Sequence, residues 1–145
     1  MPPDLATLLD FARRYTAAWC SHDAASVADF YSPDGSLCIN GGVPAVGRNA
    51  IAEAAQEFMS AFPDLHLLMD KVLPQGNSAV YHWTLTGTNT GPGGTGHRVH
   101  ISGFEVWKIG NDGLIAESLG NFDDKAYRHQ LEHGIEDHNS TKSVH

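Results

Sequence analysis

Glu105 is the residue whose type and surroundings point most directly to acid–base chemistry. It lies in a β-rich run and shares one strand face with Gly103 and Trp107, because alternate residues of a strand point the same way. The other face also carries apolar bulk, in Phe104 and Val106. If Glu105 faces the interior, lost hydration raises its pKa, and a neutral carboxyl can donate a hydrogen bond. Alternation does not decide which face is inside, so a solvated or interface carboxylate is the other interpretation.

Asp123 and Tyr15 are two further candidates. Asp123 follows the last β-rich run and precedes a segment that starts at Lys125. Since Asp is a good N-cap, capping of that segment is one interpretation of Asp123. Tyr15 lies on an apolar helical face, where a core tyrosine with a satisfied hydroxyl is expected.

The histidines and glycines do not form a recognisable metal or phosphate site. His129 and His133 are four residues apart on a possible helix, a spacing that permits joint metal ligation. No third ligand has a matching spacing, so a solvated pair is favoured and no metal is expected. His97 and His100 fall on opposite faces of a strand. The glycine-rich segment 91–96 lacks a following Lys-Ser/Thr and helix, so we interpret it as a mobile hairpin rather than a phosphate loop.

Helical patterns that could position these residues occupy the first part of the chain. Apolar residues recur at helical spacing, and Asp, Asn or Pro marks the ends. The expected helices run from the N-cap Asp4 to about Ser21, from the N-cap Asp23 to Tyr31, and from Asn49 to Pro63. Residues 32–35 are expected to break the chain, and Ser36–Asn40 to form a short strand.

Four strand candidates follow, separated by turn residues. They are Leu65–Leu73, Ala79–Thr90, His97–Ile109 and Leu114–Phe122, with Pro, Gly and Asn between them. This order predicts an antiparallel meander, and the whole chain an α+β fold with three N-terminal helices packed on a curved antiparallel sheet. A sheet rolled partly around a long helix leaves a cone, whose mouth is a ligand site. Asp124–His133 is expected to add one or two helical turns.

Length and composition limit the classes of protein. The 145 residues predict one domain over 1–145, with a core at about 5–131 and a flexible tail at 134–145. A net charge of −8 with nine Lys plus Arg argues against nucleic-acid and anionic-membrane partners. Cys20 and Cys38 are expected to be free thiols. The sequence shows no membrane-length apolar run and no secretory signal, so we expect a cytoplasmic protein.

Three segments carry a resemblance to a known family. They are Phe62-Pro63-Asp64-Leu65-His66, the run from Trp83 to Gly91, and the run from Asp112 to Asp124. They resemble the SnoaL-like polyketide cyclases of the nuclear-transport-factor-like superfamily, which includes ketosteroid isomerase and limonene epoxide hydrolase. The resemblance extends over roughly 5–131. It implies a cone-shaped, cystatin-like roll and, by analogy, a homodimer formed through the outer face of the sheet.

The resemblance also implies roles for individual residues. Asp123 occupies the place of the cyclases' general base. Glu105 stands where the cyclases have a histidine, and Leu119 where many have a tryptophan. Tyr15 and Glu105 resemble the tyrosine and protonated acid with which ketosteroid isomerase stabilises an enolate. The isomerase's own base falls near Ile39, which cannot take a proton, and the epoxide hydrolase's Arg–Asp set is absent.

These comparisons combine into one functional hypothesis. Asp123 removes a proton next to a carbonyl, while Tyr15 and neutral Glu105 donate hydrogen bonds to the oxyanion. The predicted pocket residues are Trp19, Phe58, Trp83, Trp107, His82 and Leu119. The expected ligand is a small, mostly apolar carbonyl compound, and no metal or redox cofactor is needed. The alternatives are a non-catalytic ligand-binding or dimerisation module, and a hydrolase or lyase acting on a small apolar substrate.

Overall fold

Three helices precede the last four strands of the sheet, as the sequence predicts. The computed structural model describes residues 4–135. The helices are α1 (Leu5–Cys20), α2 (Ala24–Ala28) and α3 (Arg48–Ala61). The side chain of Asp4 accepts a hydrogen bond from the backbone N–H of Thr7 at 2.7 Å, and Asp23 caps α2 in the same way. Both predicted caps are therefore confirmed, and each satisfies a backbone donor that a helix start leaves free.

Six strands form one curved, unclosed sheet in the order β2-β1-β6-β5-β4-β3. Their bounds are β1 (Tyr31–Ile39), β2 (Ala45–Val46), β3 (His66–Gln75), β4 (Ser78–Thr88), β5 (Arg98–Ile109) and β6 (Ile115–Phe122). The antiparallel meander predicted for the last four strands is confirmed. β1 pairs with β6 in parallel, so the sheet is mixed rather than entirely antiparallel. The predicted α+β class with a curved sheet is confirmed.

Two strands run through residues that the sequence marks as turns. β1 includes residues 32–35, where a break is expected, because its register against β6 shifts between Tyr31 and Ser36 and accommodates the irregular stretch. Gly35 allows the close approach, since a Cβ there would lie 2.8 Å from the Ile115 carbonyl oxygen. β3 continues through Pro74. β3 is an edge strand, where a missing N–H donor is tolerated.

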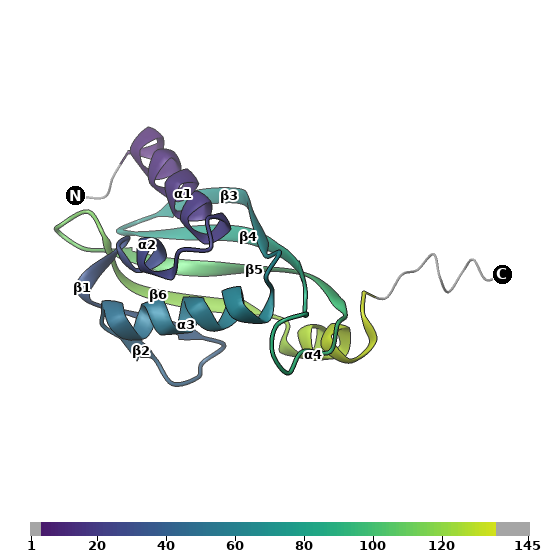
Figure 1. Cartoon of the computed structure of the whole chain (residues 1–145). Helices are drawn as coiled ribbons and strands as arrows, with labels where there is room; N and C mark the ends of the chain where they lie inside the picture. The colour runs from purple at the N-terminus through teal and green to yellow at the C-terminus, as the bar shows by residue number, and fades with distance from the viewer. Residues whose placement is uncertain (1–3, 136–145) are drawn as a thin grey trace.

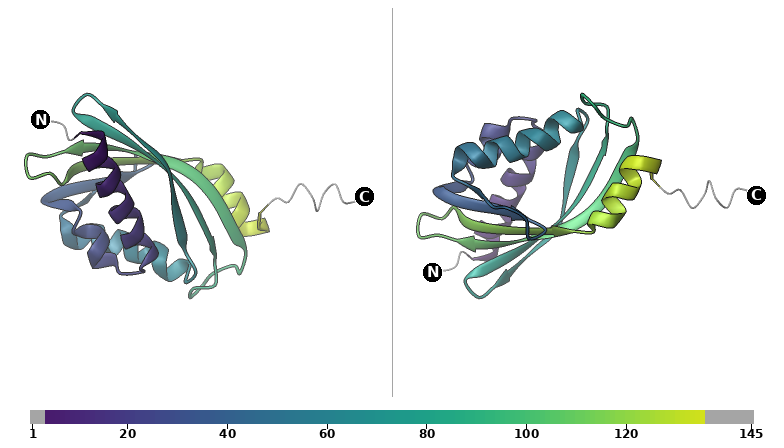
Figure 2. Two further views of the ribbon diagram at one scale, coloured as in Figure 1. Left: turned by 90° about the horizontal axis from the view of Figure 1, so that it is seen from above. Right: turned by 90° about the horizontal axis from the view of Figure 1, so that it is seen from below.

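The sheet curves around the helices, and a fourth helix packs against one end of it. Figures 1 and 2 show α1, α2 and α3 on one side of the sheet, with α4 (Asp124–His133) at the end beside β5. The side chain of Gln130 accepts a hydrogen bond from the His100 N–H at 2.6 Å and donates one to its carbonyl at 3.1 Å. The Gln130 side chain therefore makes the hydrogen bonds that a neighbouring strand would make to His100, beyond the end of β6. The Tyr127 ring packs against Phe62 and Phe122.

The two faces of the sheet differ in their surroundings. The inner face packs on the helices and supplies most of the buried core. The outer face carries exposed apolar side chains, among them Leu68, Leu73 and Leu119. The homodimer expected through this face remains a prediction. Within residues 4–135, no helix combines the length and apolar character needed to cross a membrane.

Candidate functional site

An apolar pocket lies between the helices and the inner face of the sheet. Nearly all of its lining side chains are hydrophobic, and one is a carboxyl. The lining residues are Trp19, Leu37, Ile39, Phe58, Leu67, Trp83, Leu85, Ile101, Glu105, Gly120 and Phe122. The unfilled space is about 50 Å³. An engineered cavity of about 150 Å³ binds benzene, so this pocket accepts a small group unless its walls move.

Glu105 is the titratable residue in this lining. It lies on β5 and is 8% exposed, which resolves the question of the strand face in favour of the interior. Directly opposite, across the β5–β6 pairing, stands Gly120. Because Gly120 has no side chain, the space above the carboxyl remains unfilled. The pocket therefore exposes a carboxyl to an otherwise apolar volume.

Three donors converge on one oxygen of the Glu105 carboxyl. Oε1 accepts hydrogen bonds from the Trp107 indole N–H at 2.8 Å, the Ser118 hydroxyl at 2.9 Å and the Tyr15 hydroxyl at 3.1 Å. The other oxygen, Oε2, has within the described residues one longer contact, 3.4 Å from the same Tyr15 hydroxyl. The protein thus saturates Oε1 and leaves Oε2 with capacity for a ligand or a proton.

Burial raises the pKa of Glu105, and the hydrogen bonds from Trp107, Ser118 and Tyr15 partly oppose the shift. Burial also raises the pKa of Tyr15 and Tyr31 well above the ordinary tyrosine value, and the nearby Glu105 charge adds to this. Their hydroxyls lie 3.0 Å apart. The phenols are therefore neutral donors, and Glu105 is the group of this cluster that changes protonation state nearest to neutral pH.

The aromatic rings around Trp107 keep this cluster in place. Trp107 is fully buried and stacks on Tyr81, with ring centroids 4.7 Å apart and planes at 15°. Phe11 and Tyr15 contact it edge-on at 5.6 and 5.1 Å. Such packing leaves the indole one orientation, with its N–H on the carboxyl. Trp107 therefore positions Glu105 from behind and does not line the pocket, where it was predicted.

Some of the residues predicted to form the site lie at the pocket, and others lie elsewhere. Glu105, Trp19, Phe58 and Trp83 line the pocket, and Tyr15 contacts Glu105 from behind. His82 pairs with Phe104 and Leu119 pairs with Val106, all on the face of the sheet opposite to Glu105. The predicted pocket positions of His82 and Leu119 are therefore corrected to the outer face.

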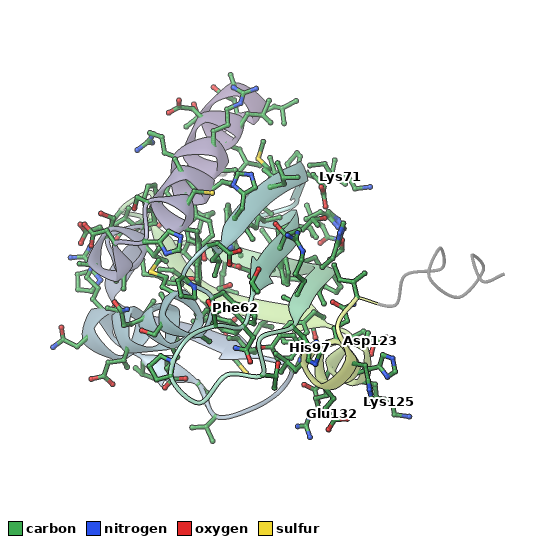
Figure 3. All side chains as sticks on the ribbon, turned by 45° about the vertical axis from the view of Figure 1, so that its right-hand side comes forward. Phe62, Lys71, His97, Asp123, Lys125 and Glu132 are labelled. Carbon is green, nitrogen blue, oxygen red and sulfur yellow. The ribbon has the colours of Figure 1, made fainter. Side chains whose placement is uncertain are left out.

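Asp123 lies outside the pocket lining. Its side chain is exposed and accepts a hydrogen bond from the Ala126 N–H at 3.0 Å, as the N-cap of α4. Figure 3 shows Asp123 where α4 begins, near the surface, whereas Phe62 lies inside. The expected convergence of Asp123 and Glu105 on one enclosed volume is not found. The general-base role of Asp123 stays a prediction, and the capping interpretation is confirmed.

Sequence reasoning missed Ser118, Tyr31 and Gly120. Ser118 and Tyr31 are both fully buried, and the register of the β5–β6 hairpin places Ser118 opposite Trp107. That pairing can be predicted from the position of the Gly110–Gly113 turn only if the register shift between Lys108 and Ile109 is known. Within residues 4–135, no three His, Cys, Asp or Glu side chains gather in a manner that could hold a metal ion.

Solved structures with the same fold cover almost the whole chain. A protein from Jannaschia sp. CCS1 assigned as a SnoaL-like polyketide cyclase is 15% identical, with a TM-score of 0.79, and the match covers 92% of this chain and 98% of that one. TsrD from Streptomyces laurentii is 21% identical, with a TM-score of 0.76 and coverage of 89% and 97%.

A third similar structure contains a small ligand. It is a hypothetical protein from Catenulispora acidiphila with a ketosteroid isomerase-like fold, in complex with trimethylamine. It is 13% identical, with a TM-score of 0.74 and coverage of 90% and 94%. No curated protein matches the chain. At these identities the structures establish the fold.

The family assignment rests on the sequence itself. The model of the SnoaL-like domain family matches residues 12–118, from the middle of α1 to the Ser118 that holds Glu105. The matched part includes Tyr15, Glu105 and Trp107 and ends before Asp123. This chain belongs to the SnoaL-like domain family.

Proposed function

We propose that this protein is a small-molecule enzyme that moves a proton at the carbon next to a carbonyl, with Glu105 as the acid–base group. The observation that carries the proposal is a buried carboxyl in an apolar pocket. Three donors bond to its Oε1, whereas Oε2 has, among the described residues, only the longer contact of 3.4 Å with the Tyr15 hydroxyl. The family and its cyclase-named relative support a role on small molecules.

The proton transfer can be written with this carboxyl alone. Ionised Glu105 takes the α proton through Oε2, which gives an enolate and a neutral carboxyl. The neutral carboxyl then donates a hydrogen bond to the enolate or returns the proton at a carbon. Burial raises the pKa of Glu105 and so makes its carboxylate a stronger base than an exposed one. Tyr15, Trp107 and Ser118 keep the charged form accessible.

Asp123 is the base that the family resemblance implies, and it competes with Glu105 for this role. It caps α4, its side chain is exposed, and it is not among the residues that line the pocket. Its position also favours a second candidate function, a binding module without catalysis, because no second carboxyl from residues 4–135 lines the pocket.

Deuterium exchange tests these possibilities without knowledge of the natural substrate. The protein is incubated with 2-pentanone in D₂O, and loss of the α-proton signals is followed by NMR. We expect acceleration by the wild type, loss of acceleration in Glu105→Gln, and retention in Asp123→Asn. Loss in Asp123→Asn instead would assign the base to Asp123. Binding without any acceleration would leave the binding module as the function.

A further inference from the structure

Two indole N–H groups in the pocket wall have no hydrogen-bond partner among the residues that the structure describes. They belong to Trp19 and Trp83, and both nitrogen atoms are buried. Each of these residues is 7% exposed. A buried donor that bonds neither protein nor water is destabilising, so native proteins contain few of them. In the wall of a pocket, a ligand acceptor is the natural partner for such a group.

The two indoles differ in what lies near them inside the protein. Trp19 lies on α1, one helical turn from Tyr15. Trp83 lies on β4, the strand that pairs with β5, which carries Glu105. Of the two unpartnered donors, the N–H of Trp83 is therefore the one that belongs to the sheet beside the pocket carboxyl.

The indole of Trp83 is fixed by its neighbours on the sheet. Trp83 on β4 pairs with Gly103 on β5, where a Cβ would lie 2.6 Å from the Trp83 Cζ2 atom. The absence of a side chain at Gly103 thus allows the indole to lie against β5. The Phe122 ring contacts it at a centroid distance of 6.0 Å. An indole held in this way has a defined orientation.

Trp83 and Glu105 are close enough for one small ligand to reach both. Trp83 pairs with Gly103, and Glu105 lies two residues further along β5 on the same face. Diagonal neighbours of this kind have Cα atoms roughly 7–8 Å apart, with the Cβ atoms somewhat closer. A molecule a few atoms long therefore spans the space between the carboxyl and the indole.

We propose that Trp83 determines specificity by donating its indole N–H to a second acceptor of the ligand, while the ligand's carbonyl faces Glu105. The ligand class is a compact, uncharged carbonyl compound with another oxygen acceptor a few atoms from the carbonyl, and the walls of the pocket, whose unfilled space is about 50 Å³, move to admit it. The apolar lining disfavours a charged ligand. This inference rests on the proposed function, because it takes the carbonyl at Glu105 as given.

Matched ketones test the inference. 2-Pentanone and methoxyacetone have the same shape, but the second carries an ether oxygen in place of a methylene. 2-Hexanone and 4-methoxy-2-butanone form a longer pair that tests a second spacing. Binding is followed in the ¹⁵N-labelled protein by the indole N–H signals, assigned with Trp→Phe variants. The Trp107 signal reports on Glu105, to which that N–H is bonded, and the Trp83 signal reports on the second acceptor.

We expect all four ketones to shift the Trp107 signal, and an ether-containing ketone to move the Trp83 signal downfield where its isostere does not. In Trp83→Phe the affinity ratio of ether to isostere should fall about fivefold, the equivalent of one neutral hydrogen bond. The matched control Trp19→Phe should keep the ratio. The wild-type shift needs no variant, so a folding defect in Trp83→Phe does not decide the outcome.

The failures of the two proposals are distinguishable. Equal Trp83 shifts within each pair, an unchanged ratio in Trp83→Phe, or loss of the ratio in Trp19→Phe overturns the role of Trp83 and leaves Glu105 in place. If no ketone shifts the Trp107 signal, the proposed function and this inference are overturned together.

Discussion

The hydroxyl of Tyr15 donates a hydrogen bond to the carboxyl of Glu105, 90 residues later in the chain, across 3.1 Å. This contact joins the first helix to the strand that carries the pocket carboxyl. It is buried, and the same hydroxyl lies 3.0 Å from that of Tyr31. The protonation of Glu105 is therefore connected to the packing of α1 on the sheet.

The stability of the fold should depend on the protonation of Glu105. Burial raises the folded-state pKa of Glu105 above its ordinary value of 4.5. The unfolded chain therefore loses this proton first as the pH rises. The stability that Glu105 contributes is complete below about pH 4.5 and is lost as the pH rises through the folded pKa.

The side chain in Glu105→Gln cannot ionise. As the pH rises from the unfolded to the folded pKa of Glu105, the free energy of unfolding of the wild type should therefore fall relative to that of the variant. Urea denaturation at a series of pH values measures the difference. Parallel curves for the two proteins would show that the folded and unfolded pKa values are the same.

Tyr15→Phe should raise the pKa of Glu105 further. The substitution removes a donor that stabilises the carboxylate, and the exchange activity should require a higher pH. Loss of the hydroxyl also leaves a buried carboxyl with one partner fewer, at a cost of about 1–3 kcal/mol. The titration is followed through the Trp107 indole signal.

Tyr81→Phe is the matched control for Tyr15→Phe. The Tyr81 hydroxyl bonds to Thr16 and not to the carboxyl. A Glu105 titration that moves equally in both variants would mean that the Tyr15 hydrogen bond has no specific effect.

Gly120→Ala should reduce ligand binding while the fold is maintained. A Cβ at Gly120 would make ordinary contacts at 3.7 Å with both the Cys38 carbonyl oxygen and Cγ of Glu105. The added methyl group occupies part of a space of about 50 Å³. Thermal denaturation should show an unchanged protein or one more stable by up to about 1 kcal/mol, and ketone titration should show weaker binding. Undiminished affinity would place the ligand elsewhere.

Asp123→Ala should destabilise α4, whereas Asp123→Asn should not. Alanine cannot accept the Ala126 N–H, and loss of a cap costs about 1 kcal/mol, while asparagine caps as well as aspartate does. Hydrogen exchange of the α4 amides measures the difference. Equal protection in Asp123→Ala and the wild type would remove the capping role.

The helices and their caps were predictable because their signals are local. Asp4 and Asp23 each precede a helical pattern and each caps it. The parallel pairing of β1 with β6 was not predictable, since no local pattern records which distant strands meet. The same holds for the register shifts between Met69 and Lys71 and between Lys108 and Ile109, whereas the shift in β1 falls on the turn residues 32–35.

One of those irregularities explains the error at Leu119. Ile115 and Ser118 are both fully buried although they are three residues apart, because the register shifts between Lys108 and Ile109. Simple alternation from Ile115 would place Leu119 inside, whereas Leu119 is 41% exposed. His82 adjoins Trp83 in a regular strand, so the two could not both line the pocket. The sequence correctly predicted four pocket residues, because aromatic and acidic residues in apolar runs are few. They are Glu105, Trp19, Phe58 and Trp83.

The parallel pairing of β1 with β6 also sets an order for biosynthesis. β1 leaves the ribosome early, yet its neighbour β6 ends at Phe122, in the last part of the chain. Until β6 is present, β1 has only the two-residue β2 as a strand partner, and Glu105 lacks Ser118. The complete sheet therefore forms only after β6 has been translated, and chains that stall before it would be aggregation-prone species for chaperones to capture.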